Sequence, residues 1–582
     1  MAVVAMATTS VGLGIGVTPA SAHALLTSTD PQGGAALATP PTRVVLSFSE
    51  SIRVSGDSIR VLDRAGNRVD LGHAQGGARA SQAMVVLRAG LPVGTYVASW
   101  RVISADSHPV SGAFAFGVGG PPDAGAARAE GTTSGSAVVG FLFGAARFAG
   151  YVGVGVLLGA CLFLVLLWPA GLRAAGSGRL LAAAWGLAVA ASAAQLLLQG
   201  LYTSGSGLGG IVHWSHLSTT LDERFGHLLL IRLLALMLAA PLLRQAARMG
   251  RPDLWRRGEL AALGLAVAVS LAAIGHGGVG DLVGLSVVSL TVHVLAMSVW
   301  IGGLAVIVVL LRTASAAEIG AVLPRWSRLA IGAVVAIVVS GLVQSWREIG
   351  SFAAVIDTGY GRMVLYKVWF VLGMLGVAAL ARQWVRRHYG SARVHPVGAA
   401  AGIEATGPDA TSNAGPDAGA EGGVDGGPGR LGGLPGAAAL AGLRRGIVAE
   451  LALAGVVLGL TATLVNMVPA RTSYAPPFHG SAFAGPMTVK VRIAPTRIGA
   501  ESIDVYAYAP TGKPQRLVAA QAQLSLPARS LGPFTVPLDL AETGHVRSDD
   551  LQVPLSGSWQ LRLSLRLNDF DEYATTLVYT VR

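Results

Sequence analysis

Apolar residues gather in long runs through the middle of the chain. Most of these runs lie between residues 137 and 385, and a last one follows at 446–468. Each run holds about 20 apolar residues, the length that a helix needs to cross a bilayer. The pattern predicts eight membrane-spanning helices, at residues 138–168, 180–202, 227–249, 259–275, 285–311, 328–346, 363–385 and 446–468.

The two flanking regions show a different period, in which apolar and polar residues alternate. Such alternation over short segments is typical of half-buried strands. We expect an all-β, immunoglobulin-like sandwich in the first flank, with strands at 44–48, 58–62, 84–87, 96–102 and 114–118. The second flank predicts another small sandwich, with strands at 487–493, 502–508, 518–526, 559–565 and 574–581.

Two stretches show neither pattern. One is rich in Pro, Gly, Ala and Ser, and the other in Gly, Ala, Pro and Asp without periodicity, so both are expected to be linkers. The predicted order is a signal peptide (1–22), a first β domain (23–119), a linker (120–136), helices one to seven (137–390), a disordered cytoplasmic linker (391–442), helix eight (443–470) and a C-terminal extracytoplasmic β domain (471–582).

The first 22 residues are small and apolar, as in an export signal. They end in Ala20-Ser21-Ala22, which fits a small-residue cleavage site and would leave His23 as the first residue of the mature chain. No Lys or Arg precedes this apolar stretch. An upstream start and an atypical signal therefore both stay open.

Arginines give the predicted orientation of the helices. One set of alternate loops holds Arg173, Arg179, Arg248, Arg251, Arg256, Arg257, Arg312, Arg325, Arg386, Arg387 and Arg393. The intervening loops hold fewer, namely Arg224, Arg347 and Arg362. Because cytoplasmic loops are enriched in Lys and Arg, both β domains are predicted to lie outside the cytoplasm, in agreement with the signal peptide.

Composition excludes several classes of protein. With 52% hydrophobic and 13% charged residues, the chain is too apolar for an ordinary soluble enzyme. The net charge of +12 comes mostly from arginines in the loops, so it does not indicate nucleic-acid binding. The sequence has no glycine–lysine motif of the kind that binds nucleotide phosphates. The one cysteine, Cys161, lies in an apolar run, so we expect neither an intrachain disulfide nor a cysteine-based metal site.

Nitrogen and oxygen donors in the first domain form a candidate metal site. A mature His23 would offer its α-amine beside its imidazole, and Asp106 and His108 are two residues apart, so that on a strand they would share a face. Two imidazoles, one amine and one carboxylate make a nitrogen-rich tetragonal set that suits Cu(II). An Asp-x-His sequence near a turn is also typical of a solvated loop, and that reading stays open.

Polar residues inside the predicted spans are a second group of candidates, because such residues are costly in a membrane. His293 lies roughly 13 Å inside the fifth span at 1.5 Å per residue, and Met297 follows at i+4 on the same face. Imidazole and thioether groups could pass Cu(I). Four further histidines fall on the outer side, namely His276, His227, His213 and His216. Plain packing or interfacial roles for these side chains stay open.

The first domain resembles the CopC family of periplasmic copper-binding proteins. The resemblance is carried by His23-Ala24, by 46–50 (LSFSE), by 94–96 (GTY) and by 100–112 (WRVISADSHPVSG). It implies that His23, Asp106 and His108 bind Cu(II), and Glu50 is interpreted as structural. The methionine-rich Cu(I) site of some members has no counterpart, because Met84 is the one methionine in 23–119.

Residues 137–470 resemble the CopD family of copper transport membrane proteins. The segments that carry this resemblance are 291–303 (TVHVLAMSVWIGG), 361–369 (GRMVLYKVW) and 461–469 (TATLVNMVP). A CopC-like domain followed by a CopD-like one resembles the YcnJ-like fusions, which implies copper uptake, homeostasis or resistance. Residues 473–582 resemble the C-terminal β domain of such fusions.

Three functions are compatible with these features. The first is a membrane transporter, not an enzyme, that captures Cu(II) outside and moves copper across the bilayer, with a copper chaperone as a further partner. The second is a membrane-anchored copper buffer or sensor, although one span would suffice for an anchor. The third is a copper-brace oxidase, against which Asp106 would fill a copper position that oxygen needs.

Overall fold

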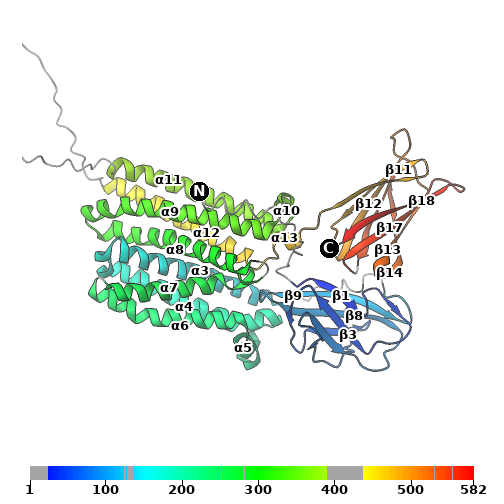
Figure 1. The fold of residues 1–582 in the computed structure, drawn as a ribbon, viewed down its shortest axis with the longest axis horizontal. Coiled ribbons are helices and arrows are strands. Elements are labelled where there is room, and N and C mark those ends of the chain that lie inside the picture. Colours follow the sequence, from blue (N-terminus) through cyan, green and yellow to red (C-terminus); the bar gives the residue numbers. More distant parts are fainter. Residues whose placement is uncertain are drawn as a thin grey trace, which may run out of the picture.

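The computed structural model describes residues 24–123, 126, 136–250, 252–279, 282–389, 437–529, 531–553 and 555–581. A β domain, a bundle of long helices and a second β domain follow one another along the chain, and both β domains lie at the same end of the bundle (Figure 1). The predicted signal peptide, His23, most of the first linker and residues 390–436 lie outside the described residues.

The N-terminal domain is a β-sandwich, as predicted. One sheet has the order β1 (Leu26–Asp30), β3 (Arg43–Phe48), β7 (Gln82–Val86), β6 (Gln75–Gly76). The other has the order β2 (Ala36–Leu37), β9 (Pro109–Val118), β8 (Gly94–Ser104), β4 (Ile52–Arg53), and β5 (Ile59–Asp63) also pairs with β8. The immunoglobulin-like character of this sandwich stays a prediction.

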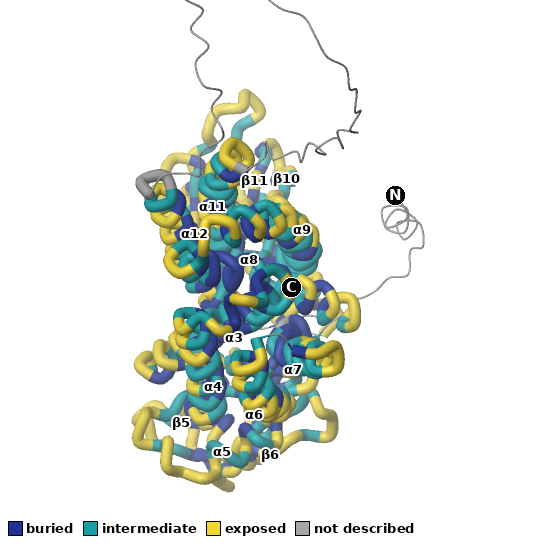
Figure 2. The backbone as a smooth tube through the Cα atoms, turned by 90° about the vertical axis from the view of Figure 1, so that its left-hand side faces the viewer, coloured by how far each residue is buried: buried dark blue, intermediate teal, exposed yellow. Residues whose placement is uncertain are grey.

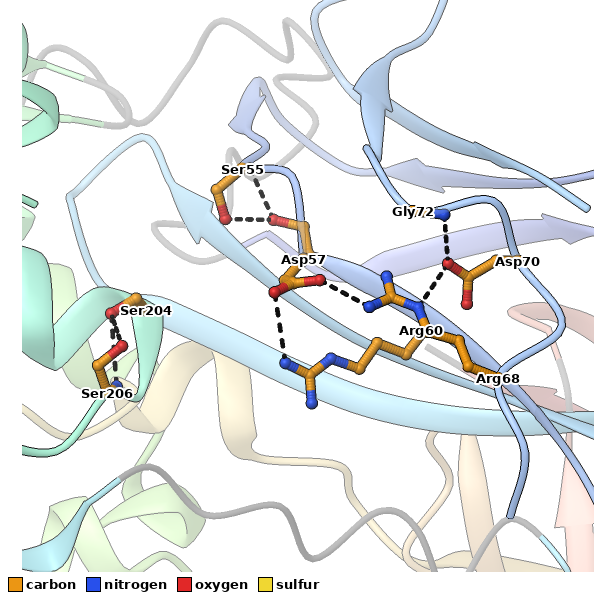
Figure 3. Close-up of polar contacts among 9 residues, drawn as sticks. Ser55, Asp57, Arg60, Arg68, Asp70, Gly72, Ser204 and Ser206 are labelled. Atoms are coloured by element: carbon orange, nitrogen blue, oxygen red, sulfur yellow. Dashed lines mark hydrogen bonds and ion pairs between the residues drawn. The ribbon is translucent and has the colours of Figure 1, made fainter. Parts of the chain in front are cut away.

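Alternating side chains from the two sheets build the core of this domain. Val44, Leu46 and Phe48 of β3 are buried, and the Phe48 ring meets Trp100 of β8 edge to face at 5.1 Å. An ion-pair network ties the loops together at one side, because Arg68 donates to Asp57 at 2.9 Å and to Asp70 at 2.8 Å (Figure 3). The domain therefore has its own core, distinct from that of the helices.

Eight long helices form the bundle within the described residues. They are α3 (Ala137–Leu166), α4 (Ala175–Ser204), α6 (Arg224–Met249), α7 (Leu254–Ala272), α8 (Val283–Thr313), α9 (Ala316–Ile349), α11 (Gly359–Tyr389) and α12 (Ala437–Leu464). Shorter helices connect them: η2 (Pro169–Arg173), η3 (Leu208–Val212), α5 (Trp214–Leu221), η4 (Gly275–Gly278), α10 (Phe352–Asp357) and α13 (Ala470–Ser473).

Seven of the long helices are long and apolar enough to cross a membrane, and α7 is the exception. Its first turns carry Arg256, Arg257 and Glu259, so only the remainder of its 19 residues is apolar. The eighth span therefore stays a prediction. Other helices extend beyond their predicted limits: α9 begins near a capping box at Ser315 and Glu318, and α12 begins at Ala437 instead of 446.

Two helices form the centre of the bundle, as the dark blue segments around α3 and α8 indicate (Figure 2). In their most apolar windows, 50% of α3 and 56% of α8 are buried, against 6% of α11. Small residues allow this close approach, because Gly159 of α3 lies against the backbone of Ser298 and Gly302 of α8. A side chain at Gly159 would push the two central helices apart.

The C-terminal region is β-rich and has two sheets around one core. The first sheet has the order β10 (Phe478–Ala484), β11 (Met487–Ala494), β12 (Gly499–Tyr508), β16 (His545–Val553), β15 (Asp539–Glu542). The second has the order β14 (Leu531–Val536), β13 (Ala519–Leu526), β17 (Gly557–Arg566), β18 (Glu572–Val581), and η5 (Pro527–Arg529) lies between β13 and β14. Trp559 is fully buried between the sheets.

Candidate metal centre

Asp106 and His108 lie in the hairpin turn between β8 and β9, not on a strand as the spacing suggested. The turn is closed by hydrogen bonds from the Ser104 amide to the His108 carbonyl and from the Ser107 amide to the Ser104 carbonyl, both at 2.9 Å. Ser107 has a φ of 68°, in the left-handed region that non-glycine residues rarely occupy. Strain of this kind is concentrated at functional loops.

The turn brings the two predicted ligands together. His108 Nδ1 lies 3.1 Å from Asp106 Oδ2, and the residues are only 4% and 3% exposed. Ser104 orients the pair, because its hydroxyl donates to the His108 carbonyl at 2.9 Å and also contacts Asp106 Oδ1. A carboxylate and an imidazole are thus held side by side out of solvent, by the conformation of the turn rather than by strand alternation.

The beginning of the described chain lies beside this turn. The Leu25 amide donates to the Ser49 hydroxyl at 2.9 Å, and the Ser49 amide donates to the Leu25 carbonyl at 2.8 Å. The next residue, Glu50, accepts a hydrogen bond from the amide of Ala105 at 3.4 Å. The segment that follows His23 is therefore linked to the Asp106 turn through two neighbouring residues, which is consistent with the structural interpretation of Glu50.

The turn also faces the end of the helical bundle. The carbonyl of Ser107 accepts a hydrogen bond from Gln199 of α4 at 3.1 Å. A Cβ atom placed on Gly275 of η4 would lie 3.8 Å from Cε1 of His108, so the imidazole lies next to this backbone. A small cavity of about 10 Å³ separates the turn from the bundle, lined by Ala105, Asp106, Ser107, Arg224, Phe225, Leu228, Ala273, Ile274 and Gly275.

Further contacts fix the N-terminal domain on the bundle. The Arg101 guanidinium donates to the last carbonyls of α4, those of Tyr202 at 2.9 Å and Thr203 at 2.8 Å. A cation at this position is also attracted by the negative, C-terminal end of the helix dipole. A second contact pairs Arg53 with Glu223, at 3.9 Å, between β4 and the start of α6. The domain is thus held at two places around the Asp106 turn.

Glu223 is an unusual member of this interface, because its side chain is only 3% exposed. Within the described residues, neither carboxylate oxygen has a hydrogen-bond partner. Burial raises the pKa of Glu223 to about 7, although Arg53 acts in the opposite direction. The carboxyl group is therefore largely neutral below neutral pH.

Polar residues line the bundle beneath the turn. The Arg147 guanidinium of α3 is buried, contacts Asn466 and lies 4.9 Å above the Phe143 ring. The Tyr202 ring stacks on the same Phe143 at 4.8 Å. A buried cation and two stacked aromatic rings therefore lie at the end of the bundle on which the N-terminal domain docks.

His293 and Met297 lie on α8 but contact different neighbours. The His293 Nδ1 atom is 2.9 Å from the Ser340 hydroxyl of α9. The Met297 methyl group points toward Gly155 of α3. The pair thus lies between α9 on one side and α3 on the other.

The remaining predicted histidines are spread over the outer end of the bundle. The rings of His213 and His216 are 6.2 Å apart at α5, where burial and the neighbouring His213 lower the pKa of His216. His227 is exposed on the first turn of α6, and His276 belongs to η4. Within the described ranges, no three His, Cys, Asp or Glu side chains lie close enough to hold a metal ion.

Sequence reasoning missed two buried carboxylates of the helical region, Glu223 and Glu450. Glu450 is 2% exposed on α12, where the Trp300 indole of α8 donates to it at 2.6 Å. Glu450 could have been found from the sequence, because it is an acidic residue within the last apolar run. Glu223 had no comparable signal, because it lies in a polar loop and its partner Arg53 belongs to another domain.

Family comparisons match three parts of the chain. The CopC domain matches residues 26–119, the Copper resistance protein D-like N-terminal domain matches 137–285, and Copper resistance protein D matches 320–406. Copper resistance protein C of Escherichia coli is 34% identical over 116 residues, which cover 90% of that protein and 18% of this chain. The chain belongs to the CopC–CopD family of copper resistance proteins.

Relatives of this CopC–CopD fusion include the copper transport protein CutJ of Bacillus subtilis, 27% identical over 383 residues, which cover 62% of this chain and 67% of CutJ. Among solved structures, CopC from Methylosinus trichosporium OB3b is 32% identical, covering 17% of this chain and 95% of that one with a TM-score of 0.16. PcoC, a methionine-rich copper resistance protein from Escherichia coli, is 29% identical, covering 16% and 98% with a TM-score of 0.15.

The matched segments confirm the predicted family and a copper-related membrane function for the fusion. Most of α8, with His293 and Met297, lies between the two matched membrane segments, which end at 285 and begin at 320. Any role of His293 and Met297 in the CopC–CopD fusion therefore rests on the geometry of α8 itself.

Proposed function

We propose that this protein captures Cu(II) outside the cytoplasm with its N-terminal domain and passes copper into the helical bundle, which moves it inward. The observation that carries the proposal is the position of the Asp106 and His108 pair. Both side chains are almost fully buried, and they face the end of the bundle instead of open solvent. A pure buffer site would have no need of this placement.

Capture would use His23, Asp106 and His108. The amine and imidazole of a mature His23, the His108 imidazole and the Asp106 carboxylate supply a set typical of Cu(II). The Leu25 amide donates to Ser49, and the Ala105 amide of the turn donates to the next residue, Glu50, so the described start of the chain supports the inclusion of His23 in this set. Ser104 acts as a positioning residue, since it orients the turn carbonyl and the carboxylate together.

Transfer would begin at η4, because Gly275 lies against the His108 imidazole and His276 is the next residue. His293 and Met297 then offer an imidazole and a thioether deeper in α8. These groups suit Cu(I) better than Cu(II). Passage through the bundle would therefore require one electron from an external reductant.

The proposed orientation places both β domains outside the cytoplasm. Both lie at the same end of the bundle, as eight crossings require (Figure 1). The loops at the opposite end carry most of the arginines, which favours the cytoplasm for that side. The predicted signal peptide, linkers and domain limits belong to this proposal, and so does a copper chaperone as partner.

Copper uptake by proteoliposomes tests the proposal. The full chain would be reconstituted with its β domains outside, supplied with copper and ascorbate, and vesicle copper would be measured over time with a copper chelator inside. We expect accumulation far beyond one copper per protein, and a strong decrease in His293→Ala. Copper that stops at the binding stoichiometry in a folded protein would instead establish a membrane-anchored buffer or sensor.

A further inference from the structure

A cavity of about 290 Å³ lies in the half of the bundle that is remote from the β domains. It is enclosed by the second halves of α8 and α11 and by the first halves of α9 and α12, four helices that lie together in Figure 1. Its walls are mostly apolar, with Ile307, Leu323 and Val334 among them. The exposed side chain of Arg382 also lines it, so the cavity reaches the surface there.

Glu450 forms the polar end of this cavity. Its side chain is almost completely buried, and one carboxylate oxygen accepts the indole hydrogen bond of Trp300 at 2.6 Å. Trp300 is itself only 5% exposed and lines the same cavity. An acidic group in a membrane helix is rare and commonly functional.

The helices packed against α12 provide little charge near Glu450. From α8 comes the uncharged Trp300 indole, and from α11 comes Arg382 at the cavity wall. The part of α3 in the same half of the bundle, residues 151–166, carries the Cys161 thiol and no charged side chain. Within the described part of the chain, no Lys, Arg or His nitrogen forms an ion pair with Glu450. An ionised carboxylate would thus lack a direct counter-ion.

The apolar surroundings of Glu450 favour a proton over a copper ion as its ligand. A carboxylate in an apolar site without a paired cation is expensive when charged and is stabilised by a proton. Copper is a poor alternative, because Cu(I) prefers sulfur and nitrogen ligands and the described cavity wall offers one carboxylate. The Trp300 hydrogen bond partly stabilises the charged form, so that both protonation states are accessible.

We propose that Glu450 is a proton-binding residue that exchanges its proton with the side of the membrane remote from the β domains, through this cavity. Its coupling to copper passage rests on the proposed transport function: the carboxylate releases one proton as one Cu(I) moves past it and regains one afterwards. The proton binding itself stands independently of transport. The residue thus links copper movement to the proton gradient.

Labelling with dicyclohexylcarbodiimide tests proton binding without transport, because this apolar reagent attacks protonated carboxyl groups within membranes. The full chain in lipid nanodiscs would be labelled at several pH values and digested for mass spectrometry. We expect modification of Glu450 that decreases as pH rises, with none at the exposed Glu572, which serves as the aqueous control. Trp300→Phe removes the hydrogen bond to the charged form and should extend labelling to higher pH. Absence of label at every pH, or labelling that does not depend on pH, would overturn the proposal.

Uptake under an imposed pH gradient tests the coupling. Wild-type proteoliposomes should take up copper several times faster under one direction of the pH gradient than under the opposite direction. Glu450→Gln should lose this difference, and Glu450→Asp should keep part of it. Cu(II) binding outside should be unchanged in both variants. If the wild type takes up copper and Glu450→Gln responds to the pH gradient as the wild type does, the coupling of copper uptake to Glu450 is excluded, while the proposed transport function stands. If the wild type takes up none, the transport function fails while the labelling result still decides proton binding.

Discussion

At the scale of single residues, the Asp106 and His108 pair defines the candidate site. The ring nitrogen and carboxylate oxygen are 3.1 Å apart in a turn whose Ser107 adopts a left-handed conformation. The conformation of the turn, and not the alternation of side chains along a strand, brings these two metal-binding groups to the same side. A metal ion bound here would gain a carboxylate and an imidazole that are already oriented.

Loss of either donor should therefore weaken Cu(II) binding. We expect His108→Asn and Asp106→Asn to reduce the affinity of the full chain by about a hundredfold or more, at or above the upper end for lost outer-shell partners of metal sites. Competition titration with a chelator of known affinity would measure this. His73→Asn is the matched control, because His73 is exposed on the same domain, and it should bind like the wild type. Equal affinities in all three variants would exclude the turn as a copper site.

Glu223 leads to a prediction about pH. Its pKa rises from the ordinary 4.5 to about 7 in the folded protein because the carboxyl group is buried. The folded state therefore holds a proton more tightly than the unfolded state, so this group makes the protein less stable as pH rises from 4.5 to 7, with no further change above.

Replacing the carboxyl group should remove this dependence. We expect Glu223→Gln to raise the unfolding temperature relative to the wild type at pH 8, where the wild-type side chain is mostly charged, and to have little effect at pH 4.5. Thermal unfolding of both proteins across this pH range measures the difference. A variant that is less stable at pH 8 would mean that the Arg53 pairing outweighs the cost of burial.

At the scale of elements, Arg101 joins the N-terminal domain to the end of α4, beside the contact between Gln199 and the Ser107 carbonyl. Arg101 donates to two carbonyls at the last turn of α4, and these groups have no partner within the helix. We expect Arg101→Gln to destabilise the docked domain by about 1.5–3 kcal/mol, the range for a lost hydrogen bond that involves a charged group. Limited proteolysis between the domain and α3 would detect undocking as faster cleavage. Arg88→Gln, at an exposed position of the same domain, should cleave like the wild type.

Elements were predictable from the sequence because their signals are local. Runs of about 20 apolar residues gave the long helices. Alternation gave β3, β5, β7, β8 and β9 of the first domain, but not β1, β2, β4 and β6. The limits of α9 and α12 were less predictable, since their end turns are polar and lie beyond the apolar core. In α7, Arg256, Arg257 and Glu259 weaken the local signal, so the structure does not decide the eighth span.

Tertiary partners could not be predicted in the same way. The spacing of Asp106 and His108 suggested that they are neighbours, but for a reason that applies to strands, whereas a hairpin turn brings them together. Glu450 meets Trp300 across 150 positions of sequence, and Glu223 is paired by a residue of another domain. No periodicity within one segment carries such information.

At the scale of the whole molecule, the main feature is the position of the turn between two domains. Both β domains lie at the same end of the bundle (Figure 1), and at that end the imidazole of His108 lies next to the backbone of Gly275 in η4. Capture and passage are thus arranged in series. In such an arrangement the N-terminal site determines the rate of copper uptake at low external copper concentration.

The dependence of initial copper uptake on external copper concentration tests this account most directly. Proteoliposomes of the wild type, His108→Asn and His73→Asn would be compared from limiting to saturating copper. We predict that His108→Asn takes up copper much more slowly at limiting copper and approaches the wild-type rate at saturation, while His73→Asn follows the wild type throughout. Identical curves for all three proteins would contradict the account, because the N-terminal site would then not supply the bundle.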